Sequence, residues 1–258
     1  MTGPRLFAAA AHQQVLLLRR SPGDLMSLAV TPLYALIFLA ITEHAGRSGL
    51  TAYAVVAPPV MALWSMALFV SGGIVDSERS GGTLEALLAT PASLTAVISA
   101  RIGAVTLISL VGVPESWLVA RLLFDVRLPV PHPALLTVVL LCTGLATAGT
   151  ATAVSVLFVL ARAARAYQNS LTYPLYILGG VIVPVSLLPD WLHPLTRLVF
   201  LSWSSALLRD CLEQAPVPGV LPRLGAVLGL GAAAYLAGSL GLRRALDRLR
   251  ATGAVGLS

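Results

Sequence analysis

The segment from Asp76 to Ser93, DSERSGGTLEALLATPAS, places a dense group of charged side chains between two long apolar runs. The charged groups are Asp76, Glu78, Arg79 and Glu85. They are too costly to bury in hydrocarbon, but they can make directional, charge-assisted hydrogen bonds to another protein. No Ser-His-Asp arrangement accompanies them, so the chemistry that they offer is docking and not catalysis.

The second half of this segment predicts a short amphipathic helix. Gly81-Gly82 provides a turn, Thr83 is suited to the N-cap, and Glu85 lies in the first turn, where the helix dipole favours a negative charge. Pro91 ends the helix. The apolar face, which can bury in a groove of a partner, consists of Leu84, Leu87 and Leu88. The alternative is a capped surface helix that binds nothing.

The composition places these residues in a membrane protein. Of the 258 residues, 57% are hydrophobic and only 11% are charged, whereas soluble domains have about 25% charged residues. All 17 basic residues are arginine. The phosphate-binding loop of ATP-hydrolysing proteins contains a lysine, so we expect no ATP hydrolysis by this chain. Cys142 and Cys211 lack metal-ligand spacing, and the four histidines are scattered, so we expect no metal site.

Six apolar stretches are long enough to cross a bilayer, which needs roughly 20 residues as helix. We expect spans at 25–42, 53–75, 95–124, 134–161, 171–188 and 223–242. Pro114 should break the third. The N-terminal stretch 1–22 predicts an interfacial amphipathic helix anchored by Arg19 and Arg20, and the whole chain, 1–258, forms one membrane domain.

The arginines predict the orientation. With the N-terminus inside, eleven arginines fall in cytoplasmic segments and six in outer ones, which favours both termini in the cytoplasm. This distribution also argues against nucleic-acid binding as the reason for the formal charge of +6. The segment 76–93 then lies in the cytoplasm.

The segment 183–214 is too polar to cross the bilayer and too apolar for an ordinary loop. We expect one or two short helices that dip into the outer leaflet, with Trp191 and Trp203 as interfacial anchors; a plain outer loop is the alternative. Just before it, Gly179-Gly180 and Pro184 form either a hinge or gate of the fifth span or a simple helix terminator.

Other polar or small residues inside the spans also invite a function. Glu115, next to Pro114, either lines a substrate path, pairs with an arginine such as Arg121, or reaches outer water. Arg101 is expected to extend its side chain to the inner interface, with a functional role as the alternative. The small-residue run Gly144–Ala151 predicts close helix packing in the fourth span, with a lining of the transport path as the alternative.

The residues of the first loop resemble the signature of the type-2 ATP-binding-cassette (ABC) exporter permeases. The likeness rests on Glu78-Arg79, Gly82-Thr83-Leu84-Glu85, Leu87-Leu88 and Thr90-Pro91. The six-span plan, the N-terminal amphipathic helix and the broken segment after the fifth span are similar as well. Ser80 stands where the family often has a third acidic residue, and Leu201-Ser202-Trp203 replaces a proline followed by an aromatic residue.

The resemblance implies an all-α membrane half-transporter in the cell membrane of a bacterium. It would work as a homodimer or heterodimer with two separate ATPase subunits, which hold ATP and Mg²⁺, while this chain binds no cofactor. Glu78, Arg79 and the helix 83–91 would form the coupling helix, and the cargo would be a drug, an antibiotic, a lipid or a glycan. The alternatives are a proton-coupled secondary carrier that uses Glu115 and a membrane-embedded enzyme.

Overall fold

A computed structural model describes residues 3–20, 26–80, 94–160 and 164–252 of the chain, and all regular structure in these residues is helical. The long helices are α1 (Gly3–Arg20), α2 (Met26–His44), α3 (Thr51–Ser80), α5 (Leu94–Ser109), α6 (Gly112–Leu123), α7 (Pro133–Leu160), α8 (Ala164–Leu178), α10 (Phe200–Asp210) and α11 (Val220–Thr252). The short ones are η2 (Ser48–Leu50), η3 (Val185–Leu187), η4 (Asp190–Leu192) and α9 (His193–Thr196).

Four helical stretches in these residues are long and apolar enough to cross a membrane: Thr51–Phe69, Ala96–Leu123, Pro133–Leu157 and Val220–Ala245. This confirms the expected all-α polytopic fold. The first and fifth expected spans correspond to the shorter helices α2 and α8, so the count of six spans stays a prediction.

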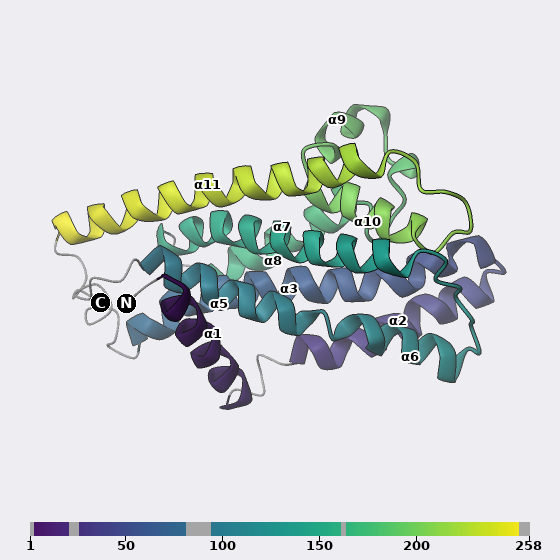
Figure 1. Ribbon diagram of the computed structural model, residues 1–258, viewed down its shortest axis with the longest axis horizontal. Coiled ribbons are helices and arrows are strands. Elements are labelled where there is room, and N and C mark those ends of the chain that lie inside the picture. Colours follow the sequence, from purple (N-terminus) through teal and green to yellow (C-terminus); the bar gives the residue numbers. More distant parts are fainter. Residues whose placement is uncertain (1–2, 21–25, 81–93, 161–163, 253–258) are drawn as a thin grey trace.

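The helices form an elongated bundle, and the chain passes back and forth along its length (Figure 1). The start of α1, the end of α3, the start of α5 and the end of α11 lie at one end, which we call the terminal end. The segments η3 to α10 lie toward the opposite end. Elements far apart in sequence therefore meet at each end of the bundle.

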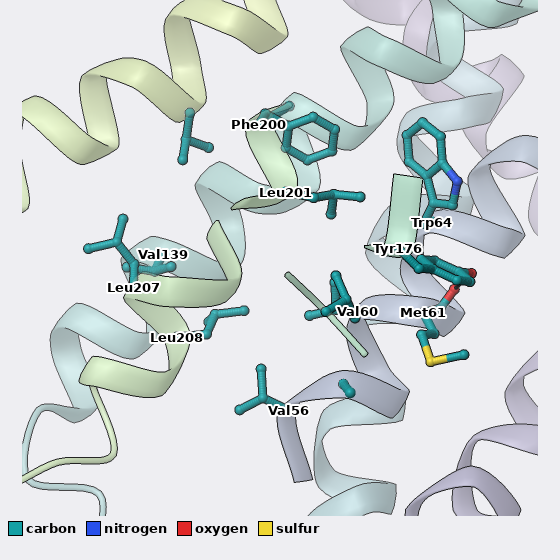
Figure 2. Close-up of a cluster of buried hydrophobic side chains, with 14 of the residues drawn as sticks. Val56, Val60, Met61, Trp64, Val139, Tyr176, Phe200, Leu201, Leu207 and Leu208 are labelled. Atoms are coloured by element: carbon teal, nitrogen blue, oxygen red, sulfur yellow. Dashed lines mark hydrogen bonds between the residues drawn. The ribbon is translucent and has the colours of Figure 1, made fainter. Parts of the chain in front are cut away.

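Helix α3 is the centre of the bundle. Its apolar stretch is 78% buried inside the protein, against 17% for that of α11, and α3 packs on α2, α5, α6, α7, α8 and α10. Trp64, fully buried, lies among side chains from α8 and α10, including Tyr176, Phe200 and Leu201 (Figure 2). A displacement of α3 therefore reaches nearly every other helix.

Small residues bring α7 and α11 into backbone contact. A Cβ atom added to Gly231 would lie 2.5 Å from the Ala146 Cα, and one added to Gly149 would lie 2.3 Å from the Gly231 carbonyl oxygen. Gly238 approaches the backbone of Ala153 in the same way. The close packing expected for the run Gly144–Ala151 is confirmed, and glycines of α11 supply the other half of the contact.

One expected helix boundary was right and one was wrong. The third span is broken close to Pro114, as expected: α5 ends at Ser109 and α6 begins at Gly112, and Pro114 lies in the first turn of α6, where its missing N–H leaves no helical bond unmade. The fifth span was expected to reach Leu188, but α8 ends at Leu178, because Gly179-Gly180 terminates it ten residues earlier.

The central helix is also longer than expected. The apolar run ends near Val75, but α3 continues to Ser80, so Asp76–Ser80 are helical and not part of a loop. Charged residues are compatible with a helix that leaves the hydrocarbon, and Gly81 is the first residue after Gly73 that disfavours it. The segment 183–214 contains the short helices η3, η4 and α9 and one longer helix, α10.

Candidate functional site

The residues predicted to couple to an ATPase are only partly within the described chain. Glu78 and Arg79 lie in the last turn of α3, at the terminal end. Gly82, Thr83, Leu84, Glu85, Leu87, Leu88 and Pro91 lie outside the described residues. Since α3 ends at Ser80 and α5 begins at Leu94, the two attachment points of the predicted coupling helix are at the terminal end.

Helix α1 is held to the middle of α5 by a buried polar contact. The Arg101 Nε donates a hydrogen bond of 2.7 Å to the Gln14 Oε1, and both side chains are nearly inaccessible, at 3% and 4% exposure. Arg101 thus reaches α1, the helix expected at the interface, and is covered by it. Arg19 and Arg20, the expected anchors, lie in the last turn of α1.

The pair Gly179-Gly180 ends α8 in a Schellman motif. The Val181 N–H donates to the Tyr176 carbonyl and the Gly180 N–H to the Ile177 carbonyl, each at 3.0 Å. Gly180 takes a φ of +59°, which favours glycine. A Cβ on Gly179 would lie 2.7 Å from the Leu201 Cβ, so both glycines are needed where α10 crosses the end of α8.

Two side chains of α10 cap the same helix end. The Ser205 hydroxyl donates to the Gly179 carbonyl at 2.7 Å, and the Arg209 Nη1 donates to the Gly180 carbonyl at 3.0 Å. Arg209 is only 8% exposed, and its guanidinium lies 4.0 Å from the ring centroid of Tyr53, at the start of α3. We call Tyr53, Gly179, Gly180, Ser205 and Arg209 the α8 cap.

The charge of Arg209 suits this position. Burial lowers the pKa of its guanidinium, but an arginine starts so high that it stays protonated. A cation at the C-terminus of a helix is favoured by the helix dipole, and a ring face adds a cation–π attraction. Arg209 and Ser205 were not predicted as functional residues from the sequence. Their spacing of four residues, in a helix with one strongly apolar face, was the signal that both side chains lie on the same side of α10.

Further contacts fasten α10 and α8 to their neighbours. The Asp210 carboxylate pairs with the Arg223 guanidinium of α11 at 2.6 Å. The Tyr176 hydroxyl of α8 donates to the Met61 carbonyl of α3 at 2.8 Å and lies 2.6 Å from the Ser65 hydroxyl. The α8 cap is thus tied to α3 and α11, the most buried and the least buried of the four apolar helical stretches.

The other predicted residues lie around this region. Pro184 precedes η3, and Trp203 is partly buried, with its Nε1 donating to the Arg197 carbonyl at 2.9 Å. Trp191 is 72% exposed. Glu115, in contrast, lies in the first turn of α6.

Comparison with known proteins identifies the family. The model of the ABC-2 type transporter family matches residues 5–212, which extend from α1 to just after α10 and leave out α11. A search of curated proteins found no match. The matched region is well over half of the chain and contains three of the four helical stretches that are long and apolar enough to cross a membrane. The chain therefore belongs to the ABC-2 type transporter family, whose members are membrane components of ABC transporters.

Proposed function

We propose that this protein is the permease of an ATP-driven exporter and that a separate ATPase subunit drives it through the segment 76–93. ATP and its Mg²⁺ bind to the ATPase, and the present chain converts the motion into transport. The family match across residues 5–212 is the observation that carries this proposal. It rests on six membrane crossings, with α2 and α8 as the two shorter ones.

The course of α3 supports a mechanical role. The helix runs without interruption from Thr51 to the charged residues Glu78 and Arg79, so a force applied there acts on the most buried helix of the bundle. Helix α5, which leaves the same segment, is joined to α1 by the bond between Arg101 and Gln14. The coupling helix is thereby joined through the chain to α3 and α5, and through the packing of α1 on α5, which includes this buried bond, to α1.

The α8 cap is suited to act as the gate. Tyr53 of α3 touches Arg209, which holds the end of α8, so motion of α3 bears on the cation that satisfies the Gly180 carbonyl. Two copies of the chain would enclose the path between them. The cargo is an amphipathic drug, antibiotic, lipid or glycan that leaves from the cytoplasm or the inner leaflet.

The test is reconstitution of the full chain in vesicles, with and without the ABC ATPase that copurifies with it from its native cell. We expect accumulation of a labelled amphipathic compound that requires both subunits and ATP. The substitution Glu85→Arg should abolish transport and copurification, because it reverses the charge at the first turn of the coupling helix. The matched change Glu213→Arg, at an exposed position beyond α10, should leave both intact.

Transport by the chain alone, driven by a proton gradient, would contradict the proposal and favour a secondary carrier. Equal copurification of wild type and Glu85→Arg would remove the coupling role of this segment.

A further inference from the structure

Three neighbouring helices are interrupted or weakened at one level of the bundle. The break between α5 and α6 falls at residues 110–111, α3 carries Pro58-Pro59, and α2 carries Pro32. Gly112 brings these sites together, because a Cβ on it would lie 3.3 Å from the Thr31 Cγ2 and 3.5 Å from the Pro59 Cα. The break in one helix therefore adjoins the proline-bearing turns of two others.

This arrangement brings polar backbone into an apolar region. Pro58 and Pro59 of α3 have no N–H, so the carbonyls of Ala54 and Val55, four residues earlier, lack the donors that a regular helix would give them. At membrane depth, irregular backbone persists where it is enclosed by protein or lines a cavity, and transporters place binding sites at such interrupted helices. At the level of Gly112, a bound molecule would therefore meet polar backbone groups as well as apolar side chains.

Glu115 lies one turn beyond Gly112, and no described residue supplies a counter-charge. Its Oε2 is buried and has no hydrogen-bond partner in the described part of the chain, while the side chain as a whole stays partly exposed. The two arginines of the same apolar stretch are engaged elsewhere, since Arg121 pairs with Asp125 at 2.6 Å and Arg101 bonds to Gln14. Among the described residues, Glu115 takes part in no ion pair.

The surroundings indicate what could neutralise this carboxylate. Val111 and Leu118, four residues before and three after Glu115, are 49% and 58% exposed, and Leu122 continues this strip. A ligand that contacts the strip and the carboxylate must be apolar with a positive charge. A metal ion fits poorly, because no three metal-binding side chains gather in the described part of the chain.

We propose that Glu115, at the break between α5 and α6, binds the cationic group of an amphipathic cargo. This inference rests on the proposed transport function and narrows its substrates to organic cations. The apolar part of the cargo lies along Val111, Leu118 and Leu122, and the carboxylate holds the charge. The weakened turns of α2, α3 and α6 allow the helices to adjust around molecules of different shape.

The test uses the full chain in lipid nanodiscs without ATPase, so it is independent of the drive mechanism. Tetraphenylphosphonium and tetraphenylborate have the same shape and opposite charge. Equilibrium dialysis should show that Glu115→Gln weakens binding of the cation about tenfold, equivalent to about 1.4 kcal/mol, and leaves binding of the anion unchanged or stronger. The matched control Glu43→Gln, at the exposed end of α2, should bind both ions as the wild type does.

A second measurement needs no variant. A hydrophobic carbodiimide should label Glu115 of the wild-type chain, as read by mass spectrometry, and tetraphenylphosphonium but not tetraphenylborate should protect it. Unchanged cation binding in Glu115→Gln, an equal loss for both ions, or labelling that the cation does not reduce would each overturn the proposal. Any of these results would leave ATP-driven export with its ATPase untouched, so the two proposals fail separately.

Discussion

Single side chains join helices that lie far apart in the sequence. Arg209 contacts the ring of Tyr53 near the start of α3 and the Gly180 carbonyl at the end of α8, and Gln14 receives Arg101 across a gap of 87 positions. Both arginines are buried, and both carry donors that a bulk apolar residue could not replace. Polar residues in apolar surroundings are costly unless they are paired, so these contacts determine how the helices meet.

Replacing Arg209 by methionine tests the α8 cap. The variant keeps much of the side-chain volume but loses the bond to the buried Gly180 carbonyl and the contact with Tyr53. We expect a loss of about 2 kcal/mol, since hydrogen bonds from charged donors contribute about 1.5–3 kcal/mol. For a chain of this size this is on the order of 5 °C in the melting temperature, measured by thermal unfolding in detergent.

The control is Arg197→Met, at an exposed position just before α10. It should melt with the wild type. If both variants lost the same stability, or neither lost any, Arg209 would not be what holds the end of α8.

Whole helices meet in two different ways in this bundle. Helices α7 and α11 approach through glycines and alanines, whereas α3 is surrounded by large apolar side chains such as Trp64. In lipid, where burial of apolar surface gives little drive, close backbone contact is a main source of helix association. The long contact with α7 explains how α11 can stay largely exposed and still be part of the bundle.

Two glycines of α11 give a matched test of this contact. A Cβ added to Gly231 would lie 2.5 Å from the Ala146 Cα, whereas one added to Gly229 would have no described neighbour within 4 Å. We expect Gly231→Ala to destabilise the protein by about 1–3 kcal/mol through overpacking. The change Gly229→Ala should be neutral or stabilise by about 0.5 kcal/mol, because alanine restricts the unfolded chain. Thermal unfolding of the two variants side by side measures both, and equal melting temperatures would contradict the packing.

Much of the fold could be predicted from the sequence because the signals were local. Apolar length indicated the helices, and the small residues of 144–151 indicated close packing. Helix ends were harder, since Pro114 is tolerated in a first turn whereas Gly179-Gly180 ends a helix inside an apolar run.

The candidate sites also include one that a local pattern indicates and others that depend on how the helices pack. Glu115 stands out in sequence as the lone acidic residue of the apolar stretch Ala96–Leu123. The pairing of Arg101 with Gln14, and of Arg209 with the end of α8, depends on which helices are neighbours, and no local pattern contains that information.

At the scale of the whole molecule, the proposed function makes α3 the helix that transmits force between the two ends of the bundle. The charged end of α3 and the start of α5 lie together at the terminal end, and the α8 cap lies toward the opposite end (Figure 1). Helix α3 ends at Ser80 in the first region and touches Arg209 through Tyr53 in the second, so it is the physical connection between them. For an ATPase to act on α3, the terminal end must face the compartment that contains ATP.

The measurement that tests this requirement most directly is accessibility labelling of Ser80→Cys in a chain without Cys142 and Cys211. We expect a membrane-impermeant maleimide to label the new thiol only after the cells are made permeable, and bound ATPase to reduce the labelling. As a check on sidedness, Arg197→Cys, before α10, should react in intact cells. Labelling of position 80 from outside intact cells would contradict the account, because no ATPase in the cytoplasm could then reach α3.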